Sequence, residues 1–257
     1  MELGCNTYSL KSCRRTIAFA HARALGFDAI ELWAGHVRGA EDDPEGIAAE
    51  ARATGLALRV FCVGGLFGLA PSDVERRLEQ CLPFAKRLGT DLVSGIVDRA
   101  ALPLVDRACA AHGVRFAVEN HWYTEMARPA DFADLDACTE RVGINVDTGH
   151  FTFLGCDLAE VARRLGPRTF NVHLKTVRVP GRAARWWQRM QRDHRMTPAL
   201  PGPHDGLDGF VAALRDAGYD GLLSVEHESD QLRLSELRDC LARARELAGA
   251  TPRTEAA

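Results

Sequence analysis

The feature that most limits the possible folds of this chain is a regular alternation of two kinds of segment. Short runs rich in apolar and β-branched residues alternate with longer amphipathic segments from one end to the other. Such alternation is typical of β-α-β units, in which helices join parallel strands. The expected strands cover residues 3–8, 27–33, 56–63, 91–97, 114–120, 142–147, 169–176 and 221–227.

Helices are expected between these strands because proline, aspartate and glycine stand at their ends. Pro44 and Pro71 open two of them, and Gly55 closes the first. Three of the expected helices cover residues 11–25, 44–54 and 71–88. Of the other five, one ends at residue 112, two begin near residues 129 and 157, and two end at residues 214 and 247. The one long irregular stretch runs from Arg178 to Gly206.

Eight such units predict an α/β fold, a (β/α)₈ TIM barrel, since that barrel has about 250 residues and this chain has 257. A doubly wound open sheet shows the same alternation and stays open as an alternative. However, no GxGxxG follows the first strand, which disfavours a dinucleotide-binding sheet. We expect a single barrel domain over residues 1–250 and a frayed tail at 251–257.

Composition narrows the functional classes. The net charge of −3, with acidic and basic residues interspersed, argues against a nucleic-acid-binding surface. The eight cysteines form no CxxC pair, so they are expected to be free and buried rather than disulfide-bonded. The first residues lack the apolar core of a signal peptide, and no stretch reaches the ~20 apolar residues of a membrane span. A cytoplasmic protein with no membrane contact is therefore expected.

Polar side chains gather at the carboxyl ends of the expected strands, where a TIM barrel carries its active site. The main candidates are Glu119, Asp147, His173 and Glu226. Each of these side chains could instead be exposed, with its hydrogen bonds satisfied by a loop. However, four polar side chains at equivalent depth on separate strands predict a metal site, because carboxylates and imidazoles are rarely buried without a partner. Three carboxylates and one imidazole suit Mn²⁺, Mg²⁺ or Co²⁺ better than Zn²⁺.

The segments FDAIELW, FAVENHW, INVDTGH, NVHLKT and LLSVEHE resemble the sugar phosphate isomerase/epimerase family, whose barrel is xylose-isomerase-like. The resemblance covers Leu3 to about Leu247. It implies that one divalent metal ion, Mn²⁺ first and Mg²⁺ or Co²⁺ as alternatives, is bound by Glu119, Asp147, His173 and Glu226. It further implies that Glu119 and Glu226 are the acid/base pair, that His150 contacts substrate, and that Glu31 contacts either a metal ligand or the substrate.

Those residue types suit proton abstraction next to a carbonyl through a metal-stabilised enediolate. Return of the proton to the opposite face gives a sugar epimerase, and return to the adjacent carbon gives an aldose–ketose isomerase. The runner-up is a lyase, because HLKTVR and the long arm after it are also similar to the inosose dehydratase branch, which acts on a keto-inositol. In that arm, Trp186 and Trp187 could cap the site, contact another subunit, or lie in a surface helix.

Several other residues have two interpretations each. Lys175 could bind a substrate oxygen or form a salt bridge. Trp33 and Phe67 could form an apolar wall for a sugar or pack in the core. His204 and Asp205 could reach the site, or only form a turn.

Two rival classes share this barrel pattern. Apurinic endonucleases need further histidines where this chain has VFCVGGLFG and LVSGIVDR, so a nuclease is disfavoured. A non-catalytic scaffold would be favoured by replaced metal ligands, and all four are present. The expected partner is a small sugar or polyol, with no phosphate cradle evident at the strand ends. The resemblance also implies a homodimer or homotetramer.

Overall fold

The eight expected strands close on themselves. The computed structural model describes residues 1–38, 42–178, 202, 205–229 and 231–249. Its strands pair in chain order, and the last pairs with the first, all in parallel. They are β1 (Glu2–Asn6), β2 (Ala29–Trp33), β3 (Ala57–Gly65), β4 (Leu92–Ile96), β5 (Arg115–Glu119), β6 (Val142–Asp147), β7 (Thr169–Leu174) and β8 (Leu222–Val225). The TIM barrel prediction is confirmed, and the open-sheet alternative is wrong.

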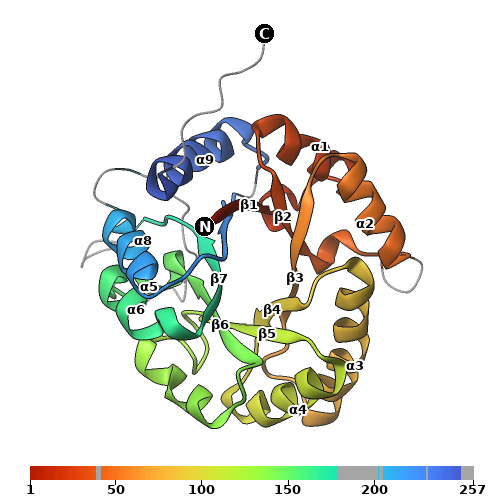
Figure 1. Cartoon of the computed structure of the whole chain (residues 1–257), viewed down its shortest axis with the longest axis vertical. Helices are drawn as coiled ribbons and strands as arrows, with labels where there is room; N and C mark the ends of the chain where they lie inside the picture. The colour runs from red at the N-terminus through yellow and green to blue at the C-terminus, as the bar shows by residue number, and fades with distance from the viewer. Residues whose placement is uncertain (39–41, 179–201, 203–204, 230, 250–257) are drawn as a thin grey trace, which may run out of the picture.

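Helices surround the barrel, as Figure 1 shows in a view along the strands. They are α1 (Arg15–Leu25), α2 (Pro44–Ala53), α3 (Pro71–Leu88), α4 (Leu102–His112), α5 (Thr148–Phe153), α6 (Leu158–Leu165), α8 (Leu207–Asp216) and α9 (Leu234–Ala248). Short 3₁₀ helices are η1 (Thr7–Leu10), η2 (Ala34–His36), η3 (Arg99–Ala101), η4 (Pro129–Ala137) and η5 (Gly166–Arg168). No helix in this described part of the chain is both long and apolar enough to span a lipid bilayer.

Local chemistry explains where the helices begin and end. The carboxylate of Asp43 accepts a hydrogen bond from the backbone N–H of Gly46, and Asp157 does the same for α6. α3 ends at Gly89, whose φ of 86° lies in the left-handed region that glycine tolerates best.

Two helix predictions need correction. The segment from Pro129 forms the 3₁₀ helix η4 rather than an α-helix; the Asp131 carboxylate accepts hydrogen bonds from the backbone N–H groups of Ala127 and Arg128 at its start. The short helix α5 was not expected, because its six residues are too few to show a helical period. It begins at Asp147, whose carboxylate accepts from the backbone N–H of His150.

The inside of the barrel changes character along its length. Near the amino ends of the strands it holds a small apolar cluster comprising Ala29, Val60, Leu92, Ala117 and Leu222. Side chains alternate between the two faces of a strand, so residues two positions further along point inward again. Those positions include Glu31, Ser94, Glu119 and Ser224, all buried. A polar layer therefore lies on the apolar one, toward the carboxyl ends.

Candidate functional site

The predicted ligand residues lie at neighbouring strand ends. Glu119 is the last residue of β5, Asp147 is the last of β6, and His173 is next to last in β7. Asp147 and His173 are direct partners in the β6–β7 register. Glu226 follows directly after β8, and all four side chains are at least nine-tenths buried.

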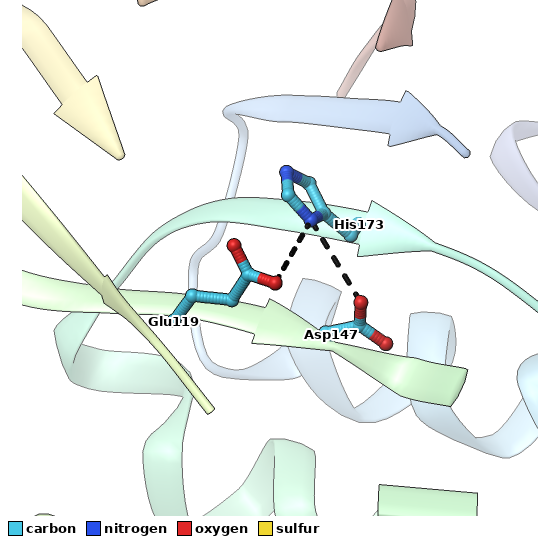
Figure 2. Close-up of side chains that lie close together, drawn as sticks. All are labelled: Glu119, Asp147 and His173. Atoms are coloured by element: carbon cyan, nitrogen blue, oxygen red, sulfur yellow. Dashed lines mark ion pairs between the residues drawn. The ribbon is translucent and has the colours of Figure 1, made fainter. Parts of the chain in front are cut away.

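The side chains of Glu119, Asp147 and His173 point toward one another (Figure 2). One ligand atom each from Glu119, Asp147 and His173 lies within 4.8 Å of the others. The Nδ1 atom of His173 is 3.8 Å from Glu119 Oε1 and 3.8 Å from Asp147 Oδ2. Glu226 Oε2 approaches the same nitrogen to 3.7 Å. The four residues proposed as ligands thus come together around one ring nitrogen.

Two properties of this cluster fit a bound cation: the separations of its oxygen and nitrogen atoms, and the lack of hydrogen-bond partners for some of these atoms in the described residues. Two atoms that each lie about 2.1 Å from a shared ion can be at most about 4.2 Å apart, and the 3.8 Å separations fall within that limit. Asp147 Oδ2 is buried and accepts no hydrogen bond in the described residues, although it pairs electrostatically with Lys175. Both ring nitrogens of the buried His150 also have no hydrogen-bond partner there. A buried set of carboxylates and imidazoles with unused lone pairs is what a divalent cation requires.

The electrostatics of the cluster reflect its crowded carboxylates. Burial is the largest cause that raises the pKa of Glu119 to about 8, and Asp147 and Glu226 raise it further while His173 opposes them. Burial acts on Asp147 in the same direction, but cationic neighbours including Lys175 hold the pKa of that carboxyl well below its usual range. The site therefore contains one carboxyl that holds a proton readily and one that stays ionised.

Lys175 lies among these carboxylates and is itself buried. Its Nζ is 2.8 Å from Asp147 Oδ2, 2.8 Å from Glu226 Oε2 and 3.0 Å from Glu228 Oε1. Burial would lower the pKa of Lys175, yet these carboxylates raise it well above its ordinary value. Of the two interpretations of Lys175, the salt bridge is therefore present.

Glu31 lies deeper than the ligand cluster and is fully buried. Its carboxylate accepts hydrogen bonds from Ser94 Oγ at 2.6 Å and Asn171 Nδ2 at 2.9 Å, and it lies 3.0 Å from His173 Nε2. Burial opposes ionisation of Glu31, but His173 and these donors hold its pKa below the ordinary value.

An aromatic rim lines part of the barrel mouth. The ring of Trp33 lies 5.1 Å from that of Tyr8 and 5.5 Å from that of His36, edge to face in both cases. Phe67 and Tyr123 are exposed, with ring centroids 5.3 Å apart. Phe67 is thus not a core residue, whereas Trp33 is half-buried beside other aromatic rings.

Some site residues had no role in the sequence interpretation. The ring of His121 packs against that of His150 with centroids 3.9 Å apart and the planes tilted by 44°, and burial lowers the pKa of His121 to about 4. Asn6 Nδ2 donates to Glu226 Oε1 at 3.1 Å, and Asn145 Nδ2 lies 3.4 Å from Glu119 Oε2. Asn145 lies two residues before Asp147, so period-two alternation was the signal that could have identified it.

One strand-end histidine lies outside the ligand cluster. His227 contacts Glu236 of α9, with 2.8 Å between Nε2 and Oε2, and is not part of the ligand cluster. His204, predicted to contact substrate, lies outside the residues that the structure describes, as do Trp186 and Trp187.

Solved structures with the same fold include several enzymes. D-psicose 3-epimerase, in the presence of D-fructose, superposes with a TM-score of 0.74 at 17% identity, over 97% of this chain and 100% of that one. A probable 3-DHS dehydratase, AsbF of Bacillus anthracis, gives 0.74 at 17% identity over 95% and 99%. The IOLI protein with a zinc atom gives 0.76 at 13% identity over 97% and 98%. Likeness at this level of identity establishes the fold alone.

Sequence comparisons go further. The rhizopine catabolism protein MocC of Rhizobium meliloti is 34% identical over 126 residues, which are 47% of this chain; the chain spans only 39% of the length of that curated relative. Residues 19–248 match the family described as xylose isomerase-like TIM barrel. This match takes in most of the barrel and all four clustered side chains, and the chain therefore belongs to the xylose isomerase-like TIM barrel family.

Proposed function

We propose that this protein is a divalent-metal-dependent sugar isomerase or epimerase that removes a proton next to the carbonyl of a small sugar or polyol. The observation that carries the proposal is the approach of three carboxylate oxygens to within 3.7–3.8 Å of His173 Nδ1. The names of the similar proteins, D-psicose 3-epimerase among them, support a small keto-sugar as substrate.

Glu119, Asp147, His173 and Glu226 would hold the ion. Their three carboxylates and one imidazole favour Mn²⁺, with Mg²⁺ or Co²⁺ as alternatives. When bound, the ion would act as a Lewis acid on the substrate carbonyl and so acidify the neighbouring C–H.

The protein's own groups supply the proton transfers. Glu119 would take up and return a proton at a carboxylate oxygen, from its place at the end of β5 inside the cluster. Glu226 would serve the other face of the substrate. His150 lies against the same cluster, with Nε2 3.5 Å from Asp147 Oδ2, and its ring nitrogens, which have no hydrogen-bond partner among the described residues, would be available to a substrate hydroxyl.

A dehydratase is the second candidate, and Lys175 is the observation that favours it. Glu226 is ion-paired with the Lys175 ammonium at 2.8 Å, so a cation lies beside one of the two proposed acid/base carboxylates. Loss of a hydroxyl as water needs a proton, which the Glu226 carboxyl would supply, while the ammonium would bind the departing oxygen. The fold likeness to a probable 3-DHS dehydratase is consistent with this alternative.

The test is incubation of the purified protein with Mn²⁺ in D₂O and a panel of ketoses and keto-inositols, followed by NMR and mass spectrometry. Deuterium in both the substrate and a stereoisomer supports the epimerase, and deuterium in an aldose–ketose pair supports the isomerase. A dehydrated product without an isomer supports the lyase. Exchange that persists in Glu119→Gln, or exchange that does not need metal, contradicts the proposal.

Two further measurements separate the rival classes. Gel-shift with abasic DNA is expected to show no binding, because the carboxyl ends of β3 and β4 supply no histidine to a further metal. Metal analysis of the purified protein is expected to find one divalent ion per chain, whereas a scaffold protein would carry none. Size-exclusion chromatography with light scattering tests the proposed homodimer or homotetramer.

A further inference from the structure

Glu31 is an ionised group enclosed entirely by protein in the polar layer of the barrel. The three residues that contact its carboxylate come from β4 and β7 and are Ser94, Asn171 and His173. A buried carboxylate is costly unless its oxygens are satisfied, and here both oxygens have donors. None of these partners lies in the aromatic rim of the mouth, so Glu31 is placed to act on His173 rather than on a substrate.

The distances around His173 decide which ring nitrogen carries the proton. Glu31 Oε1 lies 3.0 Å from Nε2, at hydrogen-bond length, whereas the nearest carboxylate oxygen on the Nδ1 side is 3.7 Å away. An ionised carboxylate only accepts hydrogen bonds. The proton of a neutral imidazole must therefore sit on Nε2, which leaves the Nδ1 lone pair facing the ligand cluster.

Two asparagine amides also approach this ring but do not reverse the assignment. Asn145 Nδ2 is 3.3 Å from Nδ1 and 3.1 Å from Nε2, and an atom nearly equidistant from both nitrogens lies over the ring face. Asn6 Nδ2 is 3.2 Å from Nε2, and one of its two N–H groups donates to Glu226 Oε1 at 3.1 Å. An unprotonated Nε2 would place its lone pair against the lone pairs of the Glu31 carboxylate at 3.0 Å, so the Glu31 contact decides the assignment.

The geometry points to Glu31 as a positioning residue that fixes the tautomer of His173, so that Nδ1 is the nitrogen presented to the metal. The inference rests on the proposed function, since it assigns Glu31 to metal binding in that same site. Ser94 and Asn171 anchor the carboxylate from two other strands. Glu31 thus acts on the metal only through the imidazole, and it contacts neither the metal nor the substrate.

A pair of variants separates this role from its alternatives. Glu31→Met removes the acceptor at nearly constant volume. Glu31→Gln keeps an oxygen for His173 Nε2, and its new amide can meet Asn171 Oδ1, which has no hydrogen-bond partner in the described residues. Isothermal titration with Mn²⁺ is expected to show about 10–100-fold weaker binding for Glu31→Met, with much of the loss rescued in Glu31→Gln. Glu2→Gln, at the opposite end of the barrel, is the control.

The tautomer itself is measured in the wild-type protein with the diamagnetic ion Mg²⁺ bound. Without a metal, burial lowers the pKa of His173 but the surrounding carboxylates raise it well above its ordinary value, so both ring nitrogens carry protons. Long-range ¹H–¹⁵N NMR of the imidazole, assigned by comparison with His173→Gln, is expected to show the proton on Nε2 in the metal-bound protein. A proton on Nδ1 overturns the inference, and so does equal loss of Mn²⁺ affinity in both Glu31 variants, which would indicate a role of charge alone. A raised KM with unchanged Mn²⁺ affinity also overturns it. Failure of the wild-type protein to bind Mn²⁺ would instead contradict the proposed function.

Discussion

The backbone of Gly149 lies directly against the side chain of Lys175. A Cβ placed on Gly149 would be 2.8 Å from Cγ and 3.0 Å from Cε of Lys175, closer than real Cβ atoms tolerate. The glycine of the VDTGH segment therefore provides space for the lysine stem, whose ammonium reaches Asp147 and Glu226.

Gly149→Ala is accordingly expected to displace the Lys175 ammonium from those carboxylates. Overpacking of this kind costs about 1–3 kcal/mol of the free energy of unfolding, and catalysis is expected to fall at least tenfold, about the effect of 1.4 kcal/mol on a barrier. Urea unfolding and turnover measure the two effects. The matched control is Gly209→Ala in α8, where a Cβ would meet Ala159 at 3.4 Å. Wild-type turnover in Gly149→Ala would show that this packing is not required.

Removal of the metal is expected to destabilise the protein. A ligand that binds only the folded state at 100 times its Kd adds about 2.7 kcal/mol, which corresponds to a rise in Tm of about 5–10 °C for a chain of this size. Tm should therefore rise by that amount with Mn²⁺ relative to EDTA. Asp147→Asn is expected to remove most of this shift, because it neutralises a ligand at the centre of the cluster, and Glu2→Gln to keep it. Identical Tm values with Mn²⁺ and EDTA would contradict the metal proposal.

Much of the fold was predictable because alternation of strand and helix patterns is a local property of the sequence. The β6 bounds agree with the expected 142–147 residue for residue. The polar residues at strand ends were also visible, since parallel strands that close in a barrel bring their carboxyl ends to one mouth.

The depth and partners of the site residues were not predictable in the same way. Register shifts interrupt the β2–β3 pairing between Ile30 and Glu31, and the β6–β7 pairing between Ile144 and Asn145. Such shifts decide which strand neighbours an inward residue meets, and they leave no local mark in the sequence. This is why Glu31 could be assigned to the site, but its contact with Asn171 could not.

The buried thiols are expected to resist labelling and to limit stability at high pH. The eight cysteines are free, and burial raises the pKa of both Cys81 and Cys109 to about 12, from an ordinary 9.0. Ellman's reagent at pH 8 should label the four buried thiols of the native protein more slowly than the four half-buried ones, and all eight after unfolding.

The sign of the pH effect follows from those raised pKa values. Above pH 9 the unfolded chain loses thiol protons that the native protein keeps, so stability is full below pH 9 and falls as the pH rises toward 12. Each such thiol contributes at most about 1.4 kcal/mol per pH unit. Urea unfolding at pH 8 and pH 10 measures the decrease in the free energy of unfolding, and this decrease should be smaller in Cys109→Ala. If the free energy of unfolding changes with pH to the same extent in Cys109→Ala as in the wild-type protein, the Cys109 thiol ionises in the native state.

The position of the Trp33 indole depends on Gly35. A Cβ on Gly35 would lie 2.1 Å from Cη2 of Trp33, so Gly35→Ala must move the ring away from Tyr8 and His36. If Trp33 forms the apolar wall for a sugar, loss of that contact is expected to raise KM about tenfold, the equivalent of 1.4 kcal/mol. Affinity for Mn²⁺ should stay unchanged, because the indole is not part of the ligand cluster. Trp33→Phe keeps an aromatic ring, so its KM should rise less than that of Trp33→Ala. Steady-state kinetics and Mn²⁺ titration on the three variants distinguish a substrate wall from packing, since a packing role would lower Tm and leave KM as it is.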